Sequence, residues 1–101
     1  MKKLIPLLFL TIIFSCTKNA VESDSAKNKT YLKAANYRDA GEKDSAYIYY
    51  ALAKDDFLKK NDSIFVAKCL VNMAIIQTEK GDNFGGIETS LEAEKYLKKN
   101  D

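Results

Sequence analysis

Hydrophobic residues recur every three or four positions through most of the chain after residue 29, which predicts amphipathic helices. The pattern is interrupted at Gly41, Asn61 and Gly81, residue types that commonly end helices. We therefore expect four helices, over residues of about 29–40, 44–60, 62–80 and 87–99. Asp44 is the expected N-cap of the second helix.

The last three of these helices each have an apolar face that we expect to form the core. The residues expected there are Ala46, Tyr50, Ala53 and Phe57; Val66, Leu70, Met73 and Ile76 or Gln77; and Ile87, Leu91, Ala93 and Leu97. Because each connection is only a few residues long, neighbouring helices must pack antiparallel. The sequence predicts an all-α fold of two antiparallel helical hairpins.

The first fifteen residues, "MKKLIPLLFLTIIFS", have the layout of a secretory signal, with a basic start and an apolar run from Leu4 to Phe14. This run is shorter than the roughly 18 residues that span a bilayer. The next residue is Cys16, and "IFSC" resembles the lipobox of bacterial lipoproteins, with Ile13 three residues before the cysteine. The resemblance implies cleavage before Cys16 and its acylation. A plain signal peptide, in which Cys16 has no role, is the alternative.

On this interpretation the chain has three parts: a signal peptide at 1–15, the lipidated Cys16 with a flexible tether at 16–29, and a helical domain at 30–101. Residues 17–29 are mostly small and polar, as is typical of a tether. The expected location is the bacterial cell envelope, with attachment to the membrane through the N-terminal lipid. Thr17, rather than aspartate, follows the cysteine, and by analogy with known lipoproteins this favours the outer membrane.

Charge and cysteine content narrow the choice of partners. Removing Lys2 and Lys3 lowers the 16 basic residues to 14, equal to the 14 acidic ones. A neutral mature chain offers no basic patch for phosphates, so we expect no nucleic-acid partner.

Cys69 lies in the apolar stretch "FVAKCLVNMAII" and is expected to be a buried structural thiol without a disulfide.

Residues suited to catalysis are scarce. The chain has no histidine, so Cys69 lacks the usual activating base, and "GDNFGG" lacks the lysine and hydroxyl that follow a phosphate-binding loop. Asp55 and Asp56 are adjacent on a helix and point in different directions, which is typical of a solvated surface. We expect no enzymatic activity, no metal and no cofactor.

The two hairpins align with each other at an offset of 40 residues. The aligned pairs are Ala34 with Ala74, Tyr37 with Gln77, Ala46 with Gly86, Tyr50 with Ser90, and Ala53 with Ala93. Small residues thus recur where two helices must approach closely. The pattern resembles the tetratricopeptide repeat, with repeats at about 29–60 and 62–99. The resemblance implies a short α-solenoid of four helices.

Repeats of this family line a concave groove with the first helix of each pair and bind peptides or partner helices there. The resemblance therefore implies a protein or peptide partner and no catalysis. By position, the groove residues would be Tyr31, Ala35, Arg38, Asp39, Lys68, Val71, Ile75, Thr78 and Glu79. Arg38 and Lys68 are the expected anchors. The alternative for each is an ordinary solvated or packing residue.

Two classes of function remain open at this point. The first is a lipid-anchored interaction module, from which an accessory subunit of an enzyme is not separable by sequence. The second is the N-terminal sensing or dimerising part of a longer repeat-containing signalling or transcription-regulatory protein. Because about three repeats are normally needed for stability, two repeats also suggest completion by a partner or by self-association.

Overall fold

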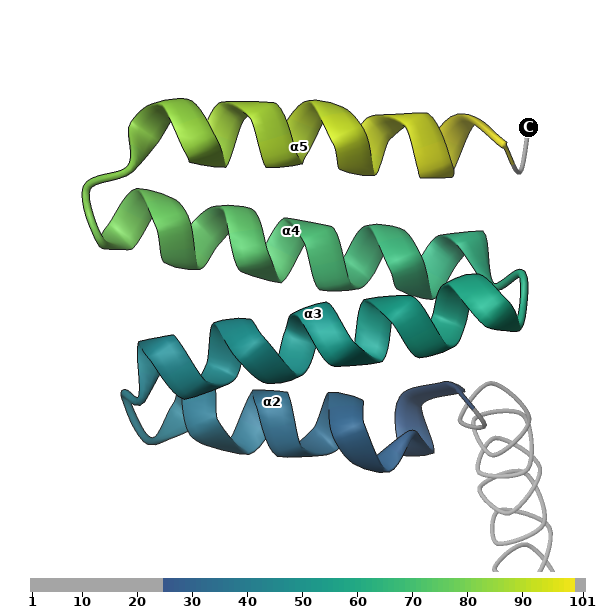
Figure 1. Ribbon diagram of the computed structural model, residues 1–101, viewed down its shortest axis with the longest axis horizontal. Helices are drawn as coiled ribbons and strands as arrows, with labels where there is room; N and C mark the ends of the chain where they lie inside the picture. Colours follow the sequence, from purple (N-terminus) through teal and green to yellow (C-terminus); the bar gives the residue numbers. More distant parts are fainter. Residues whose placement is uncertain (1–24, 100–101) are drawn as a thin grey trace, which may run out of the picture.

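The computed structural model describes residues 25–99, which form a short 3₁₀ helix and four α-helices (Figure 1). The 3₁₀ helix is η1 (Ser25–Lys27), and the α-helices are α2 (Lys29–Asp39), α3 (Lys43–Lys59), α4 (Ser63–Glu79) and α5 (Asn83–Lys98). The expected leader, Cys16 and most of the expected tether lie outside the described residues.

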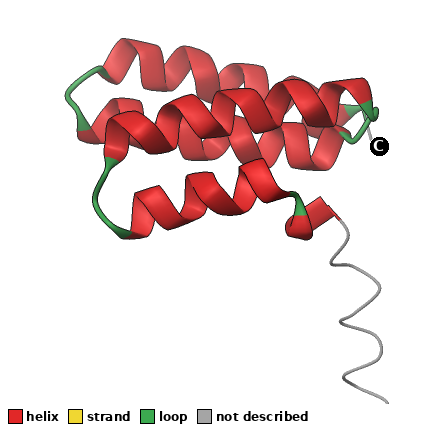
Figure 2. Ribbon diagram, turned by 60° about the horizontal axis from the view of Figure 1, so that its bottom comes forward, coloured by secondary structure: helices red, strands yellow, loops and turns green. Residues whose placement is uncertain are grey.

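Each α-helix packs against the one before it, so that α2 with α3 and α4 with α5 form two antiparallel hairpins, stacked through α3 and α4 (Figures 1 and 2). The described residues contain no strand. The predicted all-α fold of two stacked helical hairpins is therefore confirmed.

The three connections between the α-helices have the same geometry. Each passes through one residue with positive φ, namely Gly41 at 80°, Asn61 at 57° and Gly81 at 93°. The next residue then donates its backbone N–H to a carbonyl five positions earlier, as Asp82 does to Gln77 at 2.8 Å. This is the hydrogen bond of a Schellman C-cap, and it explains why glycine or asparagine stands at each predicted break.

Aspartate and asparagine side chains begin three of the four α-helices. Asn28, Asp62 and Asp82 accept the backbone N–H groups of Tyr31, Phe65 and Gly85, respectively. The prediction that Asp44 caps α3 is wrong. The helix begins one residue earlier, its N-cap Glu42 makes no side-chain cap bond, and Asp44 binds Lys80 instead.

The start of α5 also differs from the prediction. We expect the helix after "GDNFGG", but it begins at Asn83 and includes Gly85 and Gly86 of that stretch in its first turn. The Asp82 carboxylate accepts the N–H of Gly85 at 2.9 Å, so the cap offsets the poor helix propensity of the two glycines. At the other end of the described residues, the first element is η1, which begins at Ser25.

The core lies along the contact between α3 and α4. The predicted faces of these helices are buried, including Phe57, Val66, Leu70 and Ile76, each at most 1% exposed. Cys69 is fully buried, as expected, and is a free thiol in the described part of the chain. Alanines at 34, 46 and 53 are also fully buried, which allows the helices of the first hairpin and α4 to approach closely.

The predicted core face of α5 is largely wrong. Ala93 is buried as expected, but Ile87, Leu91 and Leu97 are 59%, 56% and 49% exposed. The helix instead turns Gly86 and Ala93 toward α4. Because α5 has only α4 as a major neighbour among the described helices, one helix cannot cover its remaining apolar side chains.

Candidate interaction surface

Four of the predicted groove residues lie together on α4, where they form one wall of an open groove. These are Val71, Ile75, Thr78 and Glu79. The opposite wall comes from α5, and the groove has a volume of about 420 Å³. We call its lining the α4/α5 face, which comprises Val71, Ala74, Ile75, Thr78, Glu79, Gly86, Ile87, Ser90, Leu91 and Glu94.

Close contact between α4 and α5 gives this face its shape. A Cβ atom on Gly86 would lie 3.1 Å from the carbonyl oxygen of Ala74 and closer still to Oγ1 of Thr78, so a glycine is needed at the floor. Thr78 holds its own hydroxyl against α4 by donating to the Ala74 carbonyl at 3.0 Å. The larger side chains Ile87 and Leu91 are therefore at the rim, exposed to solvent.

The predicted groove residues of the first hairpin lie elsewhere, beneath α4. The Tyr31 ring packs edge-on against Tyr50, Phe57 and Phe65, with ring centroids 5.4–6.0 Å apart. Burial raises the pKa of the Tyr31 phenol. Arg38 donates a hydrogen bond to Asn72 of α4. These two residues therefore join the hairpins.

The remaining predicted residues are more scattered. Ala35 is half-buried on α2, and Asp39 is exposed at the end of that helix. Lys68 is exposed on α4 with its ammonium 4.4 Å from the centroid of the Phe65 ring, a cation–π contact. The structure does not bring Arg38 and Lys68, the expected anchors, into the groove beside Val71 and Ile75.

Sequence reasoning missed the α5 wall of the groove. Ile87, Ser90 and Leu91 line it, although Ile87 and Leu91 were expected in the core. The internal alignment contains the signal that could have found them. Tyr50 is 3% exposed under α4, and its partner in the alignment is Ser90, a residue suited to a surface that no helix covers.

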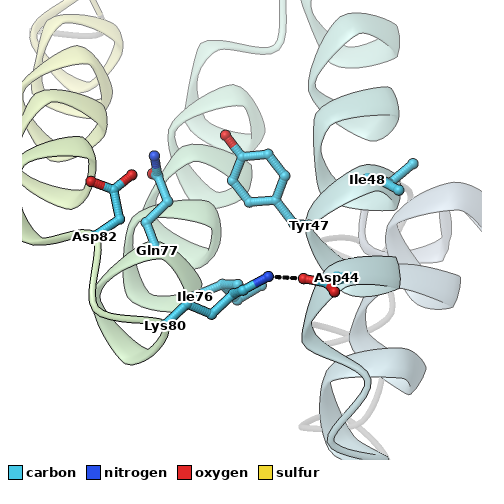
Figure 3. Close-up of a pocket in the computed structure, with 7 residues that line it drawn as sticks. All are labelled: Asp44, Tyr47, Ile48, Ile76, Gln77, Lys80 and Asp82. Atoms are coloured by element: carbon cyan, nitrogen blue, oxygen red, sulfur yellow. Dashed lines mark hydrogen bonds and ion pairs between the residues drawn. The ribbon is translucent and has the colours of Figure 1, made fainter.

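A second cavity, of about 520 Å³, lies between the start of α3 and the end of α4 (Figure 3). Lys80 donates a hydrogen bond to the Asp44 carboxylate between these two helices, and the Tyr47 ring extends from α3 into the space between them. Oε1 of Gln77, another lining residue, is buried without a hydrogen-bond partner in the described part of the chain. Through this oxygen the cavity could accept a hydrogen bond from one donor.

Chemistry at Cys69 is suppressed by its surroundings. Burial raises the pKa of this thiol to about 12, so it is protonated at neutral pH. Residues 25–99 include no group of three or more acidic, cysteine or histidine side chains placed to hold a metal ion. The arrangement of the described residues is suited to noncovalent contact through exposed apolar side chains.

The chain matches no family model, and comparisons with curated proteins and with solved structures found no match. Within residues 25–99, every helix is too short or too polar to cross a membrane.

Proposed function

We propose that this protein is a membrane-anchored lipoprotein whose tetratricopeptide-like helical repeats bind another protein, without catalysis. The observation that carries the proposal is the α4/α5 face, where Val71, Ile75, Ile87 and Leu91 are 38–59% exposed side by side. A groove with apolar walls at helical spacing fits an amphipathic helix or peptide. Contiguous exposed apolar residues of this kind are typical of interaction sites.

The burial of the small residues supports the repeat interpretation. The six small residues of the aligned pairs Ala34/Ala74, Ala46/Gly86 and Ala53/Ala93 are all buried. In both hairpins these residues let neighbouring helices approach, the role of the small positions in tetratricopeptide repeats.

The anchor and location are proposed from the leader and the lipobox resemblance. Acylation of Cys16 would hold the helical domain at a bacterial envelope membrane, the outer one favoured by Thr17. The intact mass of the native protein tests this part of the proposal. We expect the mass of residues 16–101 plus acyl chains, and loss of both processing and membrane attachment in Cys16→Ala. A much larger mass would instead favour the N-terminal part of a longer signalling protein.

Photo-cross-linking tests the interaction face in the native membrane. A photoreactive amino acid replaces Leu91, which is 56% exposed on α5, and in the matched control it replaces Leu52, which is 51% exposed on α3. We expect a protein adduct of discrete mass from position 91 and none from position 52. Absence of an adduct at position 91, or equal labelling at both positions, would refute a binding role for the α4/α5 face.

A further inference from the structure

The first hairpin has a surface equivalent to the α4/α5 face, and α4 covers it. Tyr31, Tyr50 and Phe57 form that surface and pack against α4 through Phe65 and its neighbours. Their partners at the 40-residue offset are Val71, Ser90 and Leu97, of which Val71 is 42% and Leu97 49% exposed. The internal repeat thus indicates that a helix can dock on the α4/α5 face.

A second copy of the chain could not dock there head to tail in the way α4 docks on the first hairpin. In that arrangement α2 of the second copy would take the place of α4. At the offset, Lys29 and Asn36 stand where α4 has the buried Cys69 and Ile76, and both α2 residues are exposed and polar. Burying an unpaired lysine against apolar side chains is costly. α2 therefore places polar residues, Lys29 and Asn36, where head-to-tail stacking would need apolar ones.

The outer side of α5 is better suited to contact a second copy of itself. Phe84, Ile87 and Leu91 follow one another at spacings of three and four and are all more than half exposed. Charge is divided along the same helix. Asp82, Glu88 and Glu92 precede Lys95 and Lys99, while Glu94 and Lys98 pair with each other within the helix at 3.0 Å. Two such helices are complementary in charge when they run antiparallel, because each acidic half then faces a basic half.

We propose that the exposed side of α5, which shares Ile87 and Leu91 with the α4/α5 face, binds a second copy of this chain through an antiparallel, two-fold contact between the two α5 helices. The inference rests on the proposed function and names the partner. Near a two-fold axis at Leu91, Glu88 of one copy lies beside Lys95 of the other. A two-fold contact is closed, so assembly stops at a dimer.

Charge reversal across the axis tests the antiparallel arrangement. The full chain is studied by sedimentation equilibrium in density-matched detergent, and circular dichroism checks that each variant is folded. We expect a dimer, weakened about tenfold or more by Glu88→Lys or Lys95→Glu alone, a change that corresponds to roughly 1.4 kcal/mol. The double variant carrying both reversals should regain dimerisation, because each new lysine then faces a new glutamate in the partner copy.

Replacing exposed leucines with glutamate tests which helix forms the dimer contact. Leu91→Glu should abolish the dimer, and the matched variant Leu52→Glu should leave it intact, since Leu52 is similarly exposed, at 51% against 56%, on a different helix. A dimer that survives Leu91→Glu, is lost in Leu52→Glu, or is not restored in the double charge reversal would overturn the proposal. Larger assemblies that dissociate in Lys29→Glu would show head-to-tail stacking and would also overturn it.

The experiment separates this proposal from the proposed function. If the chain sediments as a monomer while position 91 cross-links to a protein of different mass in the membrane, then the self-association proposal fails and the interaction module stands. If the chain is monomeric and position 91 yields no adduct, both the self-association proposal and the interaction module fail. An adduct of twice the chain mass from position 91, together with the dimer, supports both.

Discussion

Phe57 and Leu97 occupy equivalent positions of the two hairpins, 40 residues apart, yet they differ in exposure. Phe57 is 1% exposed, and its ring centroid lies 5.1 Å from that of Phe65 and 6.0 Å from that of Tyr31. Leu97 is 49% exposed because no described helix covers that side of α5. The same substitution at the two sites should therefore have unequal effects on the free energy of unfolding.

The expected magnitudes follow from burial. Phe57→Ala removes a fully buried ring and should lower the free energy of unfolding by about 3–5 kcal/mol. Full burial of a leucine stabilises a protein by about 1.5–3 kcal/mol, so Leu97→Ala, with half the side chain covered, should cost about 1 kcal/mol. For a domain of this size, each kcal/mol lost from the free energy of unfolding lowers Tm by about 4–8 °C. Phe57→Ala should lower Tm by at least about 12 °C.

Thermal unfolding followed by far-ultraviolet circular dichroism, at protein concentrations where the chain is monomeric, measures both effects. If Phe57→Ala fails to fold, Phe57→Leu provides a milder change, with a cost below about 1.5 kcal/mol. Equal destabilisation by Phe57→Ala and Leu97→Ala in the monomer would refute the reasoning, because it would mean that the α4/α5 side of the stack is as well covered as the α2/α3 side.

Three further predictions concern a cap, a close contact and a thiol. Asp82→Ala removes the side-chain cap of α5 and should cost about 1 kcal/mol in a urea titration, whereas Glu42→Ala, at an N-cap without such a bond, should be nearly neutral. Gly86→Ala should lower Tm because the new methyl group meets Thr78, and adding Thr78→Ala should recover part of the loss; additive effects would contradict the contact. In the Cys16→Ala chain, Cys69 should resist a thiol reagent until the protein unfolds, since burial raises the pKa of the thiol to about 12. The thiol ionises in the unfolded chain from about pH 8.5, so stability from this group is complete below that pH and is lost as pH rises toward 12; stability independent of pH across this interval would contradict its burial.

The sequence was sufficient where local rules act. Glycine and asparagine with positive φ end three helices within about one residue of the predicted breaks, because only such residues adopt this conformation readily. The apolar faces of α3 and α4 were also predicted correctly, since both helices are covered on two sides and their spacing alone identifies the buried residues. Four of the ten residues that line the candidate groove, all on α4, were predicted through the resemblance to the tetratricopeptide repeat.

Only the tertiary structure decided which apolar residues of α5 are buried. Ile87, Leu91 and Leu97 have the helical spacing of a core face, and spacing does not record how many neighbours a helix has. Among the described helices, α5 has a single major neighbour, α4. Gly86 lets α4 approach closely, so that the side of α5 with small residues packs against α4 and its large apolar side chains remain exposed. Likewise, Arg38 and Lys68 were both predicted to line the groove, but Arg38 donates a hydrogen bond to Asn72 of α4, whereas Lys68 is exposed. Periodicity along one helix specifies a face, whereas the position of that helix in the stack specifies whether the face becomes core or binding surface.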